Sequence, residues 1–230
     1  EIIDFSDNMY CYKLINGNTM SKCITKPLFL QFLDWIGNFW SPVEPNQSEF
    51  KQRCLTFYKK KTEKRVFQYF SRFRSSDNEE VINGVKVPKL SDLLKKIDWE
   101  SLSDGIPVRY HGDLHFENIL VAENGEYGDI YYDLAKLYHG IIVSHELVNK
   151  NYFNIKRDGG IINFDILRNH KLVETEKMFE KFIIEKGYDL HKVKLLTALI
   201  FLNIAALHHY PYSEFLFYLG KYQLNELVNE

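Results

Sequence analysis

The chain has 230 residues, of which 45% are hydrophobic and 26% are charged. These values are typical of globular proteins and so argue against a disordered chain, and the length leaves room for one large domain or two small ones. A formal net charge of -2 gives no overall attraction to nucleic acid or to an anionic membrane, so we expect neither as a partner. Cys11, Cys23 and Cys54 are odd in number and lack CxxC spacing, which favours a reducing, cytoplasmic setting over a disulfide framework or a zinc site.

The N-terminal part predicts two strands and then a helix. The strands are joined at Ser6-Asp7-Asn8, and the second runs from Met9 to Ile15. Thr25 is a capping candidate for the helix and Pro27 lies in its first turn. Its apolar residues recur at helical spacing, which predicts an amphipathic helix.

A second long helix is expected from Glu49 to about Phe70. It contains the basic run Lys59 to Arg65, which predicts a solvated helix face because no other basic segment adjoins it. Residues 75–89 indicate a polar loop or a small hairpin, and Ser91 is expected to cap a short helix.

The C-terminal half is predicted to be helical. The expected helices run from Leu134 to Val148, Asn169 to Lys186, Leu190 to Leu207 and Ser213 to Val228. Residues 149–160 are expected to form a loop between the first two. The most apolar run, residues 195–207, is shorter than the roughly 20 residues of a membrane span, so it predicts a buried helix and no membrane span.

The chemistry of the chain is concentrated in the pattern H-G-D-x-x-x-x-N, formed by His111, Asp113 and Asn118 and followed by an apolar strand. Phosphoryl transfer needs a carboxylate that orients the acceptor hydroxyl and oxygen ligands for magnesium, and this loop can supply both. His111 could hydrogen-bond loop carbonyls and hold the shape of the loop.

Simpler interpretations compete with this one. A lone Asp in a loop is commonly a turn residue, and a lone Asn commonly caps a helix. His111 and His115 could be a metal pair but lack a third ligand at suitable spacing. His139 and His145 lie on a predicted helix without an HExxH context, which favours structural roles.

Two segments together resemble a known family. "HGDLHFENILV", residues 111–121, is similar to the catalytic loop of the aminoglycoside phosphotransferase and choline kinase-like enzymes, and "GDIYYDLAKL", residues 128–137, is similar to the D-x-x-x-D-L-A segment that follows it. The resemblance implies an α+β, protein kinase-like fold. Residues 1–17 would then be the end of the small lobe with the hinge, and residues 18–230 the large, mainly helical lobe.

The resemblance also implies roles for individual residues. Asp113 would be the catalytic base on the loop that contains His111, and Asn118 would bind magnesium. Asp133 would be a structural acid at a helix start that bonds back to the loop around His111. Backbone groups of the hinge would bind the adenine of ATP (or GTP), and the residues implied are Lys13, Leu14 and Ile15. The implied activity is transfer of the γ-phosphate to a hydroxyl of a small molecule.

Two departures from the family pattern bear on these expectations. No second metal-binding Asp stands after the loop, because Asn124-Gly125 is followed almost at once by Gly128. Glu123, Glu126 or Asp129 could substitute, but we expect instead that a segment of the natural polypeptide is absent between Val121 and Tyr127. No Gly-rich phosphate loop or following Lys is present either, and we expect these before Glu1.

Three functions remain open at this point. The first is a small-molecule kinase acting on a sugar or an amino alcohol, since aromatic residues outnumber acidic ones in the helices that would form the acceptor pocket. The second is a catalytically inactive pseudokinase-type binding module of the same fold. The third, a eukaryotic-type protein kinase, is disfavoured by the H-G-D form and by the absence of an A-P-E-like segment.

Overall fold

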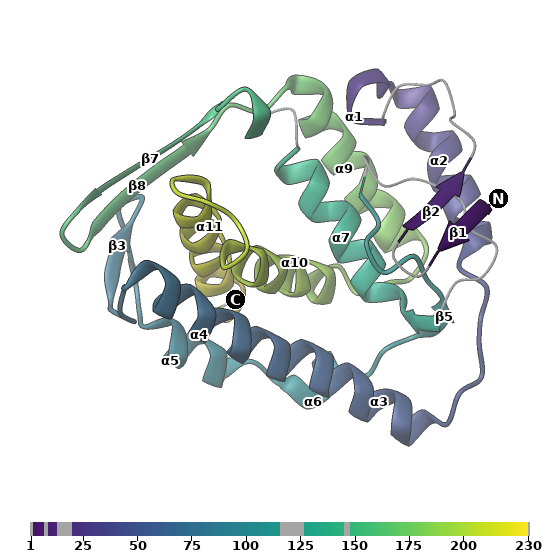
Figure 1. Ribbon diagram of the computed structural model, residues 1–230, viewed down its shortest axis with the longest axis horizontal. Helices are drawn as coiled ribbons and strands as arrows, with labels where there is room; N and C mark the ends of the chain where they lie inside the picture. The colour runs from purple at the N-terminus through teal and green to yellow at the C-terminus, as the bar shows by residue number, and fades with distance from the viewer. Residues whose placement is uncertain (1, 7–8, 13–19, 116–126, 145–147, 230) are drawn as a thin grey trace.

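The protein is α+β and about 60% helical, with a small mixed sheet at one end (Figure 1). This computed structural model describes residues 2–6, 9–12, 20–115, 127–144 and 148–229. Among these residues, no helix combines the length and apolar character needed to cross a bilayer.

The N-terminal elements agree with the sequence-based expectation where they are described. Strands β1 (Ile2–Ser6) and β2 (Met9–Tyr12) pair antiparallel, and helix α2 (Lys26–Phe39) follows them along the chain (Figure 1). A short helix, α1 (Met20–Cys23), precedes α2. The predicted cap is present, since Thr25 Oγ1 accepts a hydrogen bond from the amide of Leu28 at 3.4 Å. The expected hinge, residues 13–15, and the domain boundary at residue 17 lie outside the described residues.

The second predicted helix is continuous but not uniform. It consists of α3 (Gln47–Leu55), a π-helical turn η1 (Thr56–Lys60) and α4 (Lys61–Phe73), and it crosses the front of the molecule (Figure 1). The basic run within it is only partly a solvated face: Lys60 and Lys64 are exposed, whereas Lys61 is half-buried. The prediction for this run was therefore right only in part.

A mixed sheet of four strands lies against α11 at the far end from β1 and β2 (Figure 1). Its order is β4-β3-β8-β7, with β3 and β8 parallel and the other pairs antiparallel. Strands β3 (Glu80–Ile82) and β4 (Val85–Val87) form the hairpin that was one of the two alternatives for residues 75–89.

The expected loop over residues 149–160 is wrong. Strands β7 (Phe153–Asp158) and β8 (Ile161–Ile166) form an antiparallel hairpin there. Its turn is Gly159-Gly160, and Gly159 has a φ of +57°, a conformation that glycine adopts without strain.

The cap expected for the short helix is also wrong. Helix α5 (Leu90–Lys96) already contains Ser91 within its first turn. The carboxylate of Asp77 lies at the helix start instead, accepting from the amides of Leu90 at 2.7 Å and Ser91 at 2.9 Å. A second short helix, α6 (Trp99–Leu102), follows.

The remaining helices form the core around α10. They are α7 (Ile130–Ile142), α9 (His170–Glu185), α10 (Leu190–Ala205) and α11 (Tyr212–Leu227). Helix α10 packs against α11, α7 and α4, and most residues of α7 and α10 are buried. Helix α7 begins four positions before the predicted Leu134, because Asp129 caps it by accepting from the amide of Tyr131 at 3.1 Å.

Candidate active site

The loop that carries the H-G-D pattern follows a short strand, and that strand pairs with the one that leads into α7. Strand β5 (Pro107–Arg109) pairs antiparallel with β6 (Tyr127–Asp129). On its other edge, the amide of Arg109 donates to the carbonyl of Ser41 at 2.9 Å. Held on both sides, β5 fixes where the loop over residues 110–115 begins.

Gly128 is needed for this arrangement. A Cβ added there would lie 2.5 Å from the ring of Tyr110, which packs directly over the glycine. The ring of Tyr110 can therefore lie flat on β6 only because position 128 has no side chain.

The loop is anchored to α7 by Asp133, whose side chain is fully buried. Its carboxylate accepts from the backbone amides of His111 at 2.6 Å and Gly112 at 2.7 Å, and from Trp40 Nε1 at 3.2 Å. Gly112 has a φ of +78°, which a side chain would oppose. The bond from Asp133 back to the loop around His111 is thus present as expected, with Trp40 as an additional donor that sequence reasoning missed.

Asp113 lies on the solvent side of this anchor. Its Oδ1 is 2.6 Å from Lys136 Nζ, its Oδ2 is 3.6 Å from His115 Nε2, and its side chain is 53% exposed. The hydrogen bond from His115, followed by that from Lys136, lowers the pKa of Asp113 below its ordinary value. The carboxylate is therefore ionised at neutral pH and accessible to a ligand.

His111 contacts its own loop in a different sense from the one expected. Its Nδ1 accepts a hydrogen bond from the amide of Asp113 at 3.3 Å, whereas the sequence interpretation had the ring bonded to loop carbonyls. The imidazole still restrains the backbone beside Asp113, but as an acceptor.

Helix α7 contributes two further polar groups that sequence reasoning did not assign to the site. Lys136 lies one turn after Asp133 and pairs with Asp113, and His139 follows by three more positions. His139 is buried and its Nδ1 donates to the carbonyl of Lys136. The signal was available as polar residues every three positions in a helix that is otherwise apolar, a spacing that places them on one face.

Burial lowers the pKa of His139 to about 3, so its ring is neutral at physiological pH. The ring of His139 also meets that of His115 edge-on, at 6.2 Å between centroids. The structural role predicted for His139 fits this burial, although the residue packs beside the candidate site.

The described acidic residues near the loop do not form a magnesium site. The oxygens of Asp129 are occupied by Tyr58 OH at 2.6 Å and by the amides of Ile106 and Tyr131, so Asp129 does not fit as a substitute ligand. Asn118, Glu123 and Glu126 lie outside the described residues, as does the proposed gap after Val121. In the described part of the chain, no three His, Cys, Asp or Glu side chains come together as a metal site.

An aromatic cavity of about 130 Å³ adjoins the site. It lies between the α3–η1 segment and the start of α7, and its aromatic lining consists of Phe50, Phe57, Tyr58, Tyr110, Tyr127 and Tyr132. Tyr110 and Tyr132 connect this cavity to the loop and to α7, so aromatic surface lies within the neighbourhood of Asp113.

In comparisons with known proteins, no family model, curated protein or solved structure matches the chain. The protein kinase-like fold and the assignment to the aminoglycoside phosphotransferase and choline kinase-like enzymes therefore stay predictions from two short segments. The structure contributes a loop tied to a buried helix by Asp133, with an ionised carboxylate, Asp113, paired with Lys136 of that helix.

Proposed function

We propose that this protein is a phosphotransferase with a protein kinase-like fold, which moves the γ-phosphate of ATP (or GTP) to a hydroxyl of a small molecule. The observation that carries the proposal is the placement of Asp113: an ionised, half-exposed carboxylate on a loop whose backbone is fixed by the buried Asp133. The resemblance of residues 111–121 and 128–137 to the family segments adds the reaction class.

In this proposal, Asp113 accepts a hydrogen bond from the acceptor hydroxyl and takes its proton as the phosphoryl group is transferred. Lys136 and His115 hold the carboxylate in place and keep it charged before the acceptor arrives. Phosphoryl transfer depends mainly on positioning and on charge stabilisation, and a fixed backbone with the flanking Lys136 provides both.

Magnesium belongs to the proposal through the sequence resemblance, with Asn118 as its ligand. The described carboxylates of Asp129 and Asp133 are already committed to protein donors, so no step is assigned to a metal held by them. Nucleotide binding at Lys13, Leu14 and Ile15 rests on the resemblance in the same way.

The acceptor is proposed to be a sugar or an amino alcohol. The aromatic lining of the 130 Å³ cavity supports this class, since aromatic faces stack on sugar rings and attract ammonium groups. The competing proposal, a pseudokinase-type binding module, predicts that the same ligands bind without any nucleotide consumption.

The decisive experiment measures nucleotide consumption by the full-length protein with and without magnesium, over a panel of sugars, amino alcohols and aminoglycosides. We expect Asp113→Asn to remove acceptor-dependent consumption by at least ~100-fold while the protein stays folded. Asp92→Asn is the matched control, because Asp92 also pairs with a lysine, Lys95 at 2.9 Å, but lies on an exposed helix face. Full turnover by the Asp113 variant would refute the assignment, and binding without consumption in the natural protein would favour the binding module.

A further inference from the structure

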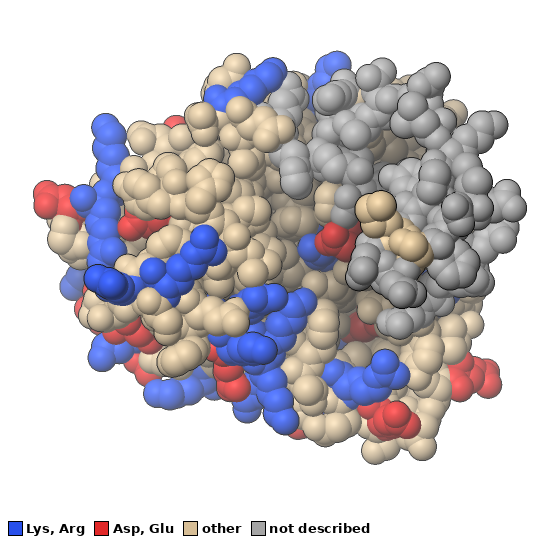
Figure 2. Space-filling model, in the orientation of Figure 1, with Lys and Arg blue, Asp and Glu red and all other residues tan. Residues whose placement is uncertain are grey.

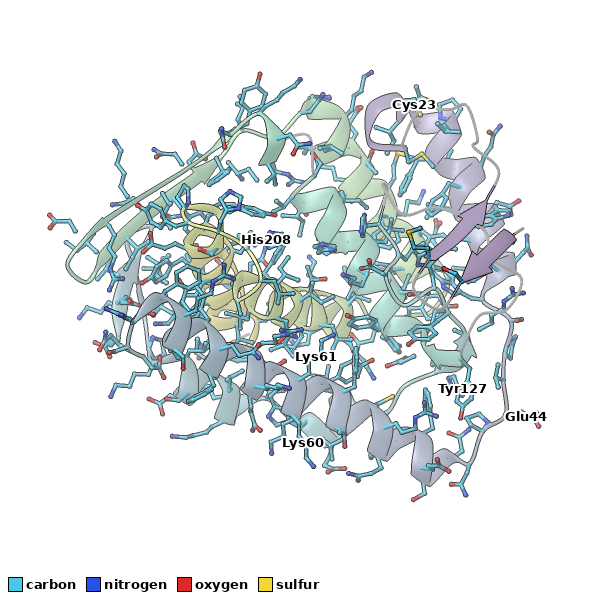
Figure 3. The ribbon with its side chains drawn as sticks, viewed as in Figure 1. Cys23, Glu44, Lys60, Lys61, Tyr127 and His208 are labelled. Carbon is cyan, nitrogen blue, oxygen red and sulfur yellow. The ribbon has the colours of Figure 1, made fainter. Side chains whose placement is uncertain are left out.

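Lys61 is a half-buried cation at the edge of the candidate site. It opens α4 directly after the π-helical turn, and Figure 3 shows its side chain on the inner side of the helix, whereas Lys60 points to the outer side. Its Nζ lies 3.2 Å from the hydroxyl of Tyr132 and 4.0 Å from the centre of the Phe57 ring. π-Helical turns occur frequently at functional sites, and this one sets the position of both Phe57 and Lys61.

The ammonium group of Lys61 lacks an ion-pair partner of its own among the described residues. No described carboxylate forms an ion pair with it, and its contacts are a phenol hydroxyl and two aromatic rings. Its charged neighbours include Lys136 and Arg65, which repel it, and Asp113, which already pairs with Lys136. Placing a cation in such surroundings costs free energy unless an anion completes the site.

The surroundings of Lys61 shift its pKa. Burial, followed by Lys136 and Arg65, lowers the pKa of Lys61 from 10.5 to about 8, although Asp113 opposes this shift. The amine thus remains mostly protonated at pH 7, and a bound anion would restore its pKa toward the ordinary value.

Space for a ligand exists beside this cation. Phe57 and Tyr132, which contact Lys61, also line the 130 Å³ aromatic cavity. On the surface, Figure 2 shows basic side chains gathered over the front face, next to a hollow where acidic and basic side chains meet. A negatively charged group entering this region would be attracted before it makes contact.

We propose that Lys61, together with Lys136 and Tyr132, forms a binding site for a phosphate group beside Asp113. Lys61 and Lys136 supply positive charge from two different helices, and the Tyr132 hydroxyl supplies a neutral hydrogen-bonding group. This proposal rests on the proposed function only for the use that is made of the bound phosphate, and not for its binding. The phosphate is either the one transferred from the nucleotide or one already present on the acceptor, and both make the same contacts.

Direct binding tests this site without any turnover. Calorimetric titration with inorganic phosphate should show saturable binding to the natural protein, at least tenfold weaker binding to Lys61→Met, and unchanged binding to Lys60→Met. Lys60 is the matched control because it is the adjacent residue of the same basic run but points away from the site (Figure 3). Equal binding by all three proteins, or none by the natural protein, overturns the proposal. If Lys61→Met fails to fold, Lys61→Gln replaces it with the same expected loss.

Two further titrations identify the source of the phosphate. ATP is compared with adenosine, and glycerol 3-phosphate with glycerol, on the same variants. If Lys61→Met loses tenfold in affinity for ATP alone, the site binds the phosphate of the nucleotide. If the tenfold loss in affinity is for glycerol 3-phosphate alone, the site binds a phosphorylated acceptor. If Lys61→Met binds both ATP and glycerol 3-phosphate as tightly as the natural protein does, the proposed site is wrong. If the natural protein consumes no nucleotide with any acceptor of the panel while phosphate binding still needs Lys61, the proposed function fails and the phosphate site stands.

Discussion

Two lysine–carboxylate pairs in this protein have the same length and different surroundings. Lys136 Nζ lies 2.6 Å from Asp113 Oδ1 at the candidate site, and Lys221 Nζ lies 2.6 Å from Glu80 Oε2 beneath the four-stranded sheet. The side chains of the second pair are 1% and 3% exposed, whereas Asp113 is 53% exposed. Distance alone therefore does not distinguish the two pairs, but access to solvent does.

The partners of each pair explain the difference. Lys221 also donates to the carbonyl of Asn78 at 2.6 Å, and Glu80 accepts from Tyr218 OH at 2.9 Å, so the buried pair joins α11 to β3 with protein groups alone. The Asp113 pair lies at a loop end, next to a cavity and to Lys61, a cation that forms no ion pair with any carboxylate in the described part of the chain. We infer that the first pair specifies the fold and that the second is arranged for a ligand.

The largest expected effect comes from breaking the buried pair. Lys221→Met leaves Glu80 charged and buried, which should lower the free energy of unfolding by about 4 kcal/mol. Lys136→Met should lower it by only about 1 kcal/mol, because water reaches Asp113. Urea denaturation of both variants measures the difference. The double variant Lys221→Met with Glu80→Met should recover most of the loss, and similar losses for both single variants would contradict the comparison.

Changing Asp133, the carboxylate that anchors the loop, should lower the free energy of unfolding nearly as much. Asp133→Asn replaces one accepting oxygen with an NH₂ group that faces a backbone amide, so a buried donor loses its partner. We expect a loss of about 3 kcal/mol, compared with less than about 1 kcal/mol for Asp113→Asn. Denaturation midpoints for the two variants measure this difference. Equal destabilisation would mean that Asp113 also has a structural role.

His139 should make stability depend on pH. The pKa of His139 is about 3 in the folded protein and lies below the ordinary 6.5. Between these values the ring is protonated in the unfolded chain but stays neutral in the folded protein. Stability present at pH 7 is therefore lost as the pH falls, by about 2 kcal/mol at pH 5. His139→Asn keeps a donor for the carbonyl of Lys136 and should remove this part of the pH dependence, while the exposed control His170→Asn should not. An unchanged slope in His139→Asn would show that this ring titrates normally.

The helices of the fold were predictable because their signals are local. Thr25 with Pro27 marks the start of α2, and the spacing of apolar residues marks the long C-terminal helices. The α5 cap was not predictable in this way, since Asp77 reaches Leu90 across thirteen positions of sequence. The pairing of β3 with β8 joins residues still farther apart in sequence, and α11 contacts β8 directly and β3 through the Lys221–Glu80 pair.

The candidate site also contains residues that the sequence identified and residues that it did not. Asp113 and Asp133 could be identified because they stand in a recognisable pattern of residue types and spacing. Lys136 could have been noticed as a charged residue in the apolar helix α7, but its partner could not. Lys61 looked like a solvated member of a basic run, and its burial follows from the packing of α4 and η1 beside α7, which no local pattern records.

The smallest expected effect concerns the stability cost of Lys61. Below about pH 8 this lysine is charged in both the folded and the unfolded chain, and the folded protein bears the cost of desolvating it near Lys136 and Arg65. Lys61→Met keeps the apolar stem against Phe57 and Tyr132, so in phosphate-free buffer it should raise the free energy of unfolding at pH 7 by about 1 kcal/mol. From pH 8 to 10.5 the folded natural protein releases its proton before the unfolded chain does, so its stability rises and the advantage of the variant disappears.

Thermal unfolding at pH 7 and pH 10 measures both values, with Lys60→Met as the control for loss of a surface charge. A variant less stable than the natural protein at pH 7 would mean that Lys61 holds the fold together. A more stable variant that binds phosphate poorly would mark Lys61 as a residue retained for its ligand.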